Sequence, residues 1–248
     1  MPDMDVAVLI EYLSEHGDRL AAAADRAGWD APVPGTEWTI RQLVTHLGGV
    51  HRWAADIVDT ANATGDTPAG QAVGNGPPDD ELLEWYVNGH AALVQTLRDA
   101  PDDLECFTFL PADSPLHFWA RRQAHETAIH RADAEAAAPT GDVTPFDAPF
   151  AQDGMAELLL GFARRRSNAI ARPGTIGLDA ADGPSWLITL GGERIEAAPT
   201  EDLVDTDVVV RGLSSDLYLW LWNRPTEAAV DGDEAVAAAW SSVRVHWS

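Results

Sequence analysis

The stretch Arg121-Arg-Gln-Ala-His-Glu-Thr-Ala-Ile-His-Arg-Ala-Asp133 lies in a segment whose periodicity predicts a helix from about Leu116 to Ala137. Small residues recur every four positions along this helix and would allow close packing against a neighbouring helix: Ala120, Ala124, Ala128 and Ala132. Glu126 and His130 are also four positions apart, which places both side chains on one face, about one turn apart. The stretch therefore predicts a closely packed helix that presents a carboxylate and an imidazole together.

The Glu126–His130 pair has two interpretations. It is either a solvated pair with a weak interaction along the helix, or part of a metal site like those that helical bundles build in their cores from glutamate and histidine. Trp119 and Ile129 lie on the same side of the helix, which favours a partly buried polar site over open surface. His125 is rotated by about 100° from Glu126 and does not share that direction.

A second helix is predicted to begin at Thr39, where Thr39 and Gln42 form a capping-box pattern. His46 lies at the edge of the apolar stripe of this helix. A lone histidine in that setting is more often a satisfied core-edge side chain than a ligand, so both interpretations stay open here. His51 is rotated by about 140° from His46, so the two histidines cannot serve one metal together.

The remaining pattern predicts a helical region followed by a small mixed domain. Further helices are expected at about 5–27, 79–99 and 150–166, and short strands at 175–179, 185–190, 194–197 and 207–210. A short helix ending at Trp222 and a final helix over 233–242 complete the chain. We therefore predict an α plus α+β fold, with a helical bundle over 1–149 and a C-terminal helix with a small α+β domain over 150–248.

Composition excludes several classes of partner. The chain has 248 residues and a formal net charge of −24, which argues against nucleic acid or anionic lipid because both require a basic patch. All 16 basic residues are arginine, so Schiff-base chemistry on lysine and a lysine-containing phosphate loop are excluded. An anionic substrate would have to be held by arginine, backbone amides or a metal.

The sequence also indicates the compartment. Cys106 is the only cysteine, which rules out an internal disulfide and fits a reducing cytoplasm. No run of about 18 apolar residues is present, as a membrane span would need. The acidic start Met1-Pro-Asp-Met-Asp5 lacks the positive charge of a secretory signal. We expect a cytoplasmic protein that does not cross a membrane.

Two motifs together resemble the mycothiol-dependent maleylpyruvate isomerase family, whose members have DinB-like metal-binding bundles. The motifs are Trp38-Thr-Ile-Arg-Gln-Leu-Val-Thr-His46-Leu-Gly and the stretch from Arg121 to Asp133. The resemblance implies a DinB-like four-helix bundle followed by a small sterol-carrier-like α+β domain. It also implies that His46, Glu126 and His130 are the metal ligands. Two histidines and one glutamate suit Zn²⁺ or another first-row divalent metal, with positions left for water or substrate.

The resemblance further implies a catalytic arginine in the C-terminal domain. Leu221-Trp-Asn-Arg224 takes the place of the family's L-x-G-R signature, with Asn223 where glycine is usual. Arg224 would then hold the carboxylate of a small anionic substrate. The co-substrate implied is a low-molecular-weight thiol such as mycothiol, whose thiolate adds to an electrophilic carbon. Addition to a cis double bond allows rotation before elimination, whereas retention of the sulfur gives S-transfer.

Three functions therefore remain open. The chain is expected to be a metal-dependent, thiol-using isomerase or S-transferase. The alternatives are a metal-dependent hydrolase that needs no thiol, and a non-catalytic module that binds a metal or ligand. Metal-bound imidazoles normally donate their second N–H to a carboxylate or carbonyl. Asp133, three residues from His130, is the nearest carboxylate in the sequence for that role.

Overall fold

The structure is a computed structural model that describes residues 4–112, 114–163, 172–191 and 195–243. The chain divides into two compact units, Met1–Thr144 and Pro145–Ser248. This division falls a few residues before the boundary at residue 149 that the sequence pattern suggests. Each unit has its own core, and the two are described separately below.

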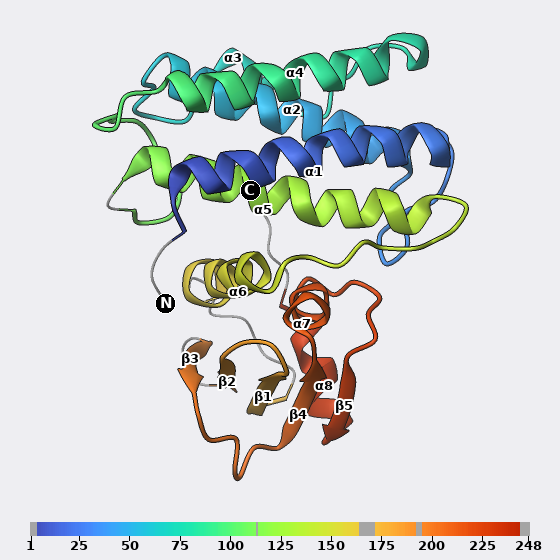
Figure 1. Ribbon diagram of the computed structural model, residues 1–248, viewed down its shortest axis with the longest axis vertical. Coiled ribbons are helices and arrows are strands. Elements are labelled where there is room, and N and C mark those ends of the chain that lie inside the picture. The colour runs from blue at the N-terminus through green and yellow to red at the C-terminus, as the bar shows by residue number, and fades with distance from the viewer. Residues whose placement is uncertain (1–3, 113, 164–171, 192–194, 244–248) are drawn as a thin grey trace. The chain divides into compact units, whose positions relative to one another are not determined.

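The first unit is built on long helices that run side by side (Figure 1). They are α1 (Val6–Ala27), α2 (Ile40–Asp59), α4 (Asp79–Asp99) and α5 (Pro115–Ala137), with a short α3 (Pro68–Gln71) in the connection between α2 and α4. α1 packs chiefly against α5, and α2 packs chiefly against α4. The four long helices confirm the predicted four-helix bundle.

Polar side chains cap the starts of three of these helices, α1, α2 and α5. Asp5 and Ser114 accept hydrogen bonds from backbone N–H groups in the first turns of α1 and α5. Thr39 and Gln42 form the predicted capping box at the start of α2, which satisfies N–H groups that would otherwise have no partner. Because the cap fixes the first turn of α2, it also fixes the direction in which His46 points two turns later.

Helix α5 is buried over most of its surface. The four alanines of its small-residue stripe are at most 2% exposed, and the apolar stripes of α1 and α2 are likewise buried. Unusually for a bundle helix, α5 also carries buried charged side chains: Arg122, Glu126, His130, Arg131, Asp133 and Glu135. Burying a charge is costly unless it is paired, so these groups must be arranged as partners.

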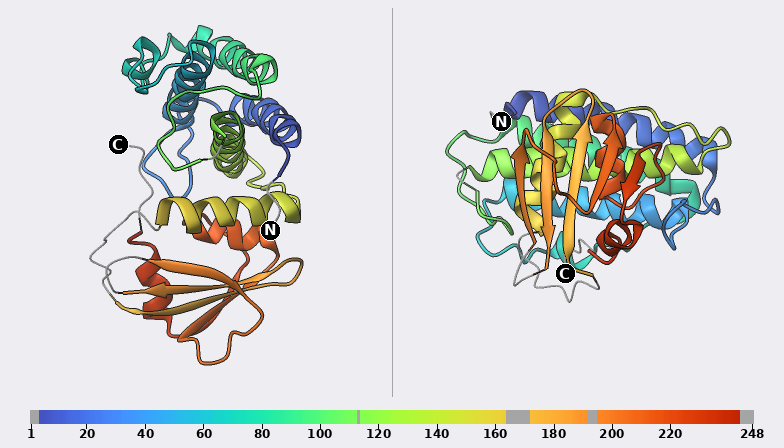
Figure 2. Two further views of the ribbon diagram at one scale, coloured as in Figure 1. Left: turned by 90° about the vertical axis from the view of Figure 1, so that its left-hand side faces the viewer. Right: turned by 90° about the horizontal axis from the view of Figure 1, so that it is seen from below.

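The second unit is a mixed five-stranded sheet with helices (Figure 2). Its strands are β1 (Gly174–Ala180), β2 (Ser185–Leu190), β3 (Glu196–Thr200), β4 (Val208–Gly212) and β5 (Ala229–Gly232), in the order β3-β2-β1-β4-β5. Among the strand pairs of the described residues, β1–β4 is parallel and the others are antiparallel. The helices are α6 (Ala148–Ala156), its π-helical continuation η1 (Glu157–Phe162), α7 (Ser214–Leu221) and α8 (Glu234–Trp240).

One face of this sheet is the apolar core of the unit. Leu178 pairs with Trp186 and Val210, and all three side chains are buried. Ile176 lies two residues along on the same face and pairs with Ile188 and Val208, in accordance with the two-residue period of a strand. α6 and α7 lie side by side over this sheet (Figure 2).

The predicted fold class is confirmed, with differences at particular elements. β5 was not predicted because its four residues are all exposed and lack an alternating apolar pattern. The expected helix over 150–166 is instead α6 followed by the π-helical η1, a distinction that apolar spacing does not reveal. Residues 164–166 of that helix and residue 194 of one expected strand lie outside the described residues. Among the described helices, none is both long and apolar enough to span a membrane.

Candidate metal centre

Three side chains from two helices converge in the first unit. His46 comes from α2, and Glu126 and His130 come from successive turns of α5. One donor atom from each lies within 4.8 Å of the others, and in the described part of the chain no other group of three or more His, Cys, Asp or Glu side chains does this. The structure therefore brings together the three residues that the motifs singled out.

The distances within this cluster fit a metal better than direct hydrogen bonds. Oε1 of Glu126 lies 3.5 Å from Nε2 of His46 and 3.4 Å from Nε2 of His130. A typical N–H···O hydrogen bond is about 2.9–3.0 Å long. Ligands of a tetrahedral metal at about 2.0–2.1 Å stand roughly 3.3 Å apart. The donor set and its spacing therefore fit a divalent ion of the Zn²⁺ type.

Asp133 holds His130 from its other side. Oδ2 of Asp133 lies 2.9 Å from Nδ1 of His130, and the Asp133 side chain is 2% exposed. The sequence left a carboxylate such as Asp133 or a carbonyl open as the partner of His130, and the structure places Asp133 there. A carboxylate at Nδ1 favours the tautomer that carries its proton there, which keeps the Nε2 lone pair directed at the cluster.

Burial and the neighbouring charged groups shift the pKa values at this site in opposite directions. Burial by itself would raise the pKa of Glu126, but the neighbouring imidazoles of His130 and His46 and the positive charge of Arg122 hold it well below its usual value. Burial would lower the pKa of His130, but the carboxylates of Asp133 and Glu126 raise it to about 9. The surroundings thus keep Glu126 ionised, which is the state required of a metal ligand.

Arg122 contacts the other oxygen of Glu126. Its Nη2 donates to Oε2 at 3.0 Å, and the Arg122 side chain is 0% exposed. Arg122 precedes Glu126 by four residues on α5, so both face the same way. The sequence places Arg122 on this side of the helix, and the spacing is the signal that could have identified the contact.

Trp38 lies over both imidazoles. Its ring centroid is 4.9 Å from that of His46 and 5.8 Å from that of His130. The segment before α2 is fixed by hydrogen bonds from Val33 N to Trp38 O and from Trp38 N to Thr36 Oγ1. Trp38 belongs to the motif quoted above, but its place against both rings is evident only in the tertiary structure.

His51, the other histidine of α2, lies outside the cluster. His51 is fully buried, and its Nε2 lies 2.9 Å from Oγ1 of Thr127. Its ring is packed near those of Tyr86 and His90. Burial, followed by the neighbouring His90, lowers the pKa of His51 well below its usual value. His51 is therefore a neutral core side chain outside the cluster, and His125 is likewise buried and not a member.

Arg224 lies in the second unit, at the turn that ends α7. Arg224 N donates to Leu219 O at 3.0 Å and Asn223 N donates to Trp220 O at 2.9 Å, which is the hydrogen-bond pattern of a Schellman C-cap. Asn223 has φ 57°, a left-handed conformation that glycine adopts most readily and asparagine tolerates. Asparagine can thus replace the glycine usual in this signature.

The Arg224 side chain is half-buried in this turn. Its Nη1 donates to the carbonyl oxygen of Trp222 at 2.9 Å. Pro225 follows directly and cannot extend the helix. The turn therefore fixes the backbone of Arg224 and holds one nitrogen of its guanidinium.

Comparisons with known proteins agree with this architecture. A family model described as the mycothiol maleylpyruvate isomerase N-terminal domain matches residues 11–135. A crystal structure of the mycothiol-dependent maleylpyruvate isomerase has a TM-score of 0.63 at 18% identity and covers 92% of this chain and 94% of its own. A crystal structure of a histidine-to-alanine mutant of a mycothiol-dependent maleylpyruvate isomerase has a TM-score of 0.59 at 17% identity, covering 88% and 89%. At such identities the likeness shows the fold. No curated protein matches significantly.

Proposed function

The chain belongs to the mycothiol maleylpyruvate isomerase N-terminal domain family, and on that premise we propose that it is a metal-dependent enzyme that uses a low-molecular-weight thiol. The proposed reaction is isomerisation or S-transfer on a small electrophilic substrate that carries a carboxylate. The observation that carries the proposal is the convergence of His46, Glu126 and His130 within 4.8 Å. Mycothiol is the thiol suggested by the names of the family and of the similar structures.

The residues of the cluster have separate roles in this proposal. His46, Glu126 and His130 would hold a divalent metal, most simply Zn²⁺. Such an ion, when bound, favours the thiolate form of a sulfur ligand and supplies a Lewis acid. Asp133 keeps the Nε2 atom of His130 directed at the cluster, and Trp38 shields the two imidazoles on one side. His46 is the most accessible of the three, with 23% of its side chain exposed.

The composition limits which groups of the chain could bind a carboxylate substrate. Because the chain contains no lysine, a carboxylate must be recognised by arginine, backbone amides or the metal. We propose Arg224 as that arginine, since the C-cap of α7 fixes it in a defined turn and a guanidinium can bind a carboxylate through two parallel hydrogen bonds.

The experiment that tests this function combines metal analysis with turnover assays. The purified protein should contain one divalent metal per chain and convert maleylpyruvate, or conjugate an electrophilic carboxylate, only when mycothiol is present. Turnover without any thiol would instead indicate a hydrolase. A metal-loaded protein that turns over none of a panel of such substrates would indicate a non-catalytic binding module.

Arg224 is tested separately. Arg224→Ala should leave the metal content unchanged and lower turnover, and Arg224→Lys should not restore it fully, because lysine lacks the planar fork. Turnover by Arg224→Ala at the wild-type rate and KM would remove Arg224 from the proposal while leaving the metal centre in place.

A further inference from the structure

Glu126 uses its two carboxylate oxygens differently. Oε1 is the atom that lies 3.5 and 3.4 Å from the two imidazole nitrogens. Oε2 accepts a hydrogen bond from Nη2 of Arg122 at 3.0 Å. A carboxylate that is free to rotate could offer a metal either one oxygen or both. The contact with Arg122 selects one arrangement.

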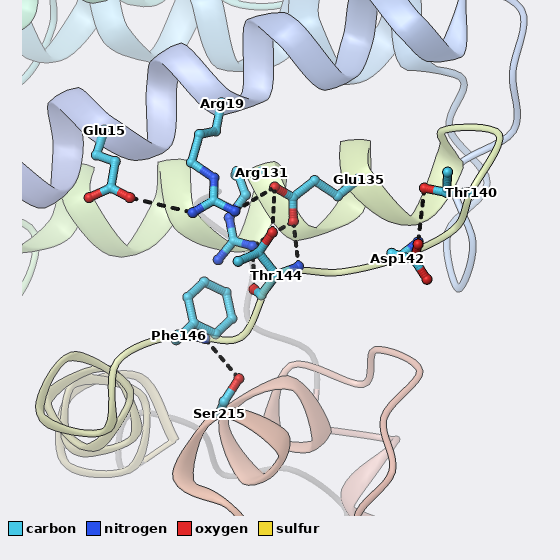
Figure 3. Close-up of polar contacts among 9 residues, drawn as sticks. All are labelled: Glu15, Arg19, Arg131, Glu135, Thr140, Asp142, Thr144, Phe146 and Ser215. Carbon is cyan, nitrogen blue, oxygen red and sulfur yellow. Dashed lines mark hydrogen bonds and ion pairs between the residues drawn. The ribbon is translucent and has the colours of Figure 1, made fainter.

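Helix α5 contains a second buried arginine–glutamate pair with the same spacing. Arg131 is 0% exposed and donates to Oε2 of Glu135 at 2.6 Å (Figure 3). Here, however, both carboxylate oxygens are occupied by donors. Oε2 also accepts from Thr144 N at 2.7 Å, and Oε1 accepts from Arg19 at 3.2 Å and from Thr144 Oγ1 at 3.3 Å.

The two pairs therefore differ in one respect that bears on ligand binding. Among the described residues, the donors that contact Glu135 occupy both of its oxygens, so the carboxylate connects α5 to α1 and to the chain at Thr144. Glu126 has one oxygen engaged by arginine and the other directed at two imidazoles that are too distant for short hydrogen bonds. Of these two glutamates, Glu126 is thus the one arranged to give one oxygen to an ion.

We propose that Arg122 is a positioning residue that makes Glu126 a one-oxygen metal ligand, an inference that rests on the metal centre of the proposed function. Arg122 binds Oε2 and so prevents it from becoming a second ligand atom. A catalytic metal site with three protein ligand atoms keeps a coordination position open. By holding back Oε2, Arg122 preserves that position for the sulfur of the thiol or for the substrate.

Co²⁺ binding to the full-length protein tests this role without measuring activity. The affinity is obtained by competition with a chelator, and the visible spectrum of bound Co²⁺ reports its coordination. Arg122→Met should weaken Co²⁺ binding by about 10–100-fold, the range found when the partner of a metal ligand is lost, and should change the spectrum. Arg122→Lys, which can still donate to Oε2, should recover part of the affinity.

The matched control is Arg131→Met, which removes an equally buried arginine with the same spacing on the same helix. It should keep the wild-type affinity and spectrum. A folded Arg122→Met protein that binds Co²⁺ like the wild type would overturn the inference, and so would equal losses in the two variants, which would indicate a general effect of breaking a buried pair. If Arg122→Met does not fold, Arg122→Leu takes its place, because an apolar side chain likewise cannot donate to Oε2.

The two proposals fail in different ways. If the folded wild-type protein binds no Co²⁺ or Zn²⁺, the metal centre itself is wrong, and the role of Arg122 falls with it. If the wild type binds the ion with the stoichiometry of one per chain but Arg122→Met is unaffected, only the positioning role is wrong.

Discussion

The two buried arginine–glutamate pairs of α5 have the same spacing and the same burial but different surroundings. Around Arg131 and Glu135, donors from α1 and from Thr144 occupy both carboxylate oxygens (Figure 3). Around Arg122 and Glu126, one oxygen is left to face His46 and His130. The first arrangement connects parts of the bundle, and the second provides a ligand atom.

The histidines beside the two pairs show the same contrast. Next to Glu126, the carboxylates of Asp133 and Glu126 overcome burial and raise the pKa of His130 to about 9. In the other region, burial and then the positive charges of Arg131 and Arg19 together lower the pKa of His16 to about 3. The lesson is that the sign of the nearby charge, rather than burial alone, decides whether the pKa of a buried histidine rises or falls.

The largest effect should come from removing a ligand. His46→Ala should lower metal affinity by more than about 100-fold, because changes to groups that merely support ligands already cost about 10–100-fold. The measurement is metal content per chain after dialysis, together with Co²⁺ titration. His51→Gln on the same helix is the control and should retain one metal per chain. If His46→Ala still binds one metal per chain, the claim that the Glu126 region, unlike the Glu135 region, forms the metal site would be wrong.

The second effect concerns stability in the other region. Arg131→Met should lower the free energy of unfolding by about 3–5 kcal/mol, the usual cost of breaking a buried ion pair. The lower end is expected because Arg19 and Thr144 still contact Glu135. Urea unfolding of the metal-free protein measures the change. A stability close to that of the wild type would mean that Arg131 does not connect these segments.

The smallest effect is the contribution of His16 to acid sensitivity. The folded state keeps His16 neutral down to about pH 3, whereas the unfolded chain binds a proton below about pH 6.5. The unfolded state therefore holds more protons in this window, and stability is full above pH 6.5 and falls as the pH decreases.

Below pH 6.5, His16→Gln should reduce the slope of the free energy of unfolding against pH by up to about 1.4 kcal/mol per pH unit. The free energy of unfolding, measured at several pH values below 6.5 in both proteins, gives the two slopes. The buried neutral histidines His51 and His90 remain in the variant and keep part of the slope. Identical slopes would show that His16 does not resist protonation in the folded protein.

Local sequence determined most of the helical unit. The periodicity gave α4 its observed bounds, Asp79–Asp99, and the capping box at Thr39 lies where the pattern placed it. The four-residue spacing of Glu126 and His130, and the three-residue spacing of His130 and Asp133, were enough to predict that these side chains are neighbours. Residues three or four positions apart lie side by side on a helix. β5 could not be found this way, since an exposed edge strand of four residues has no pattern to distinguish it.

The sequence by itself therefore determined the four long helices of the bundle, the fold class and which side chains of α5 share a face, because these depend on short-range geometry. Tertiary structure decided that His46 meets Glu126 across two helices, that Trp38 covers both rings, and which oxygen each glutamate offers. It also decided that the two arginine–glutamate pairs of α5, which have identical spacing, have different roles. The physical reason is that a carboxylate's orientation depends on every donor around it, and those donors come from segments far apart in the chain.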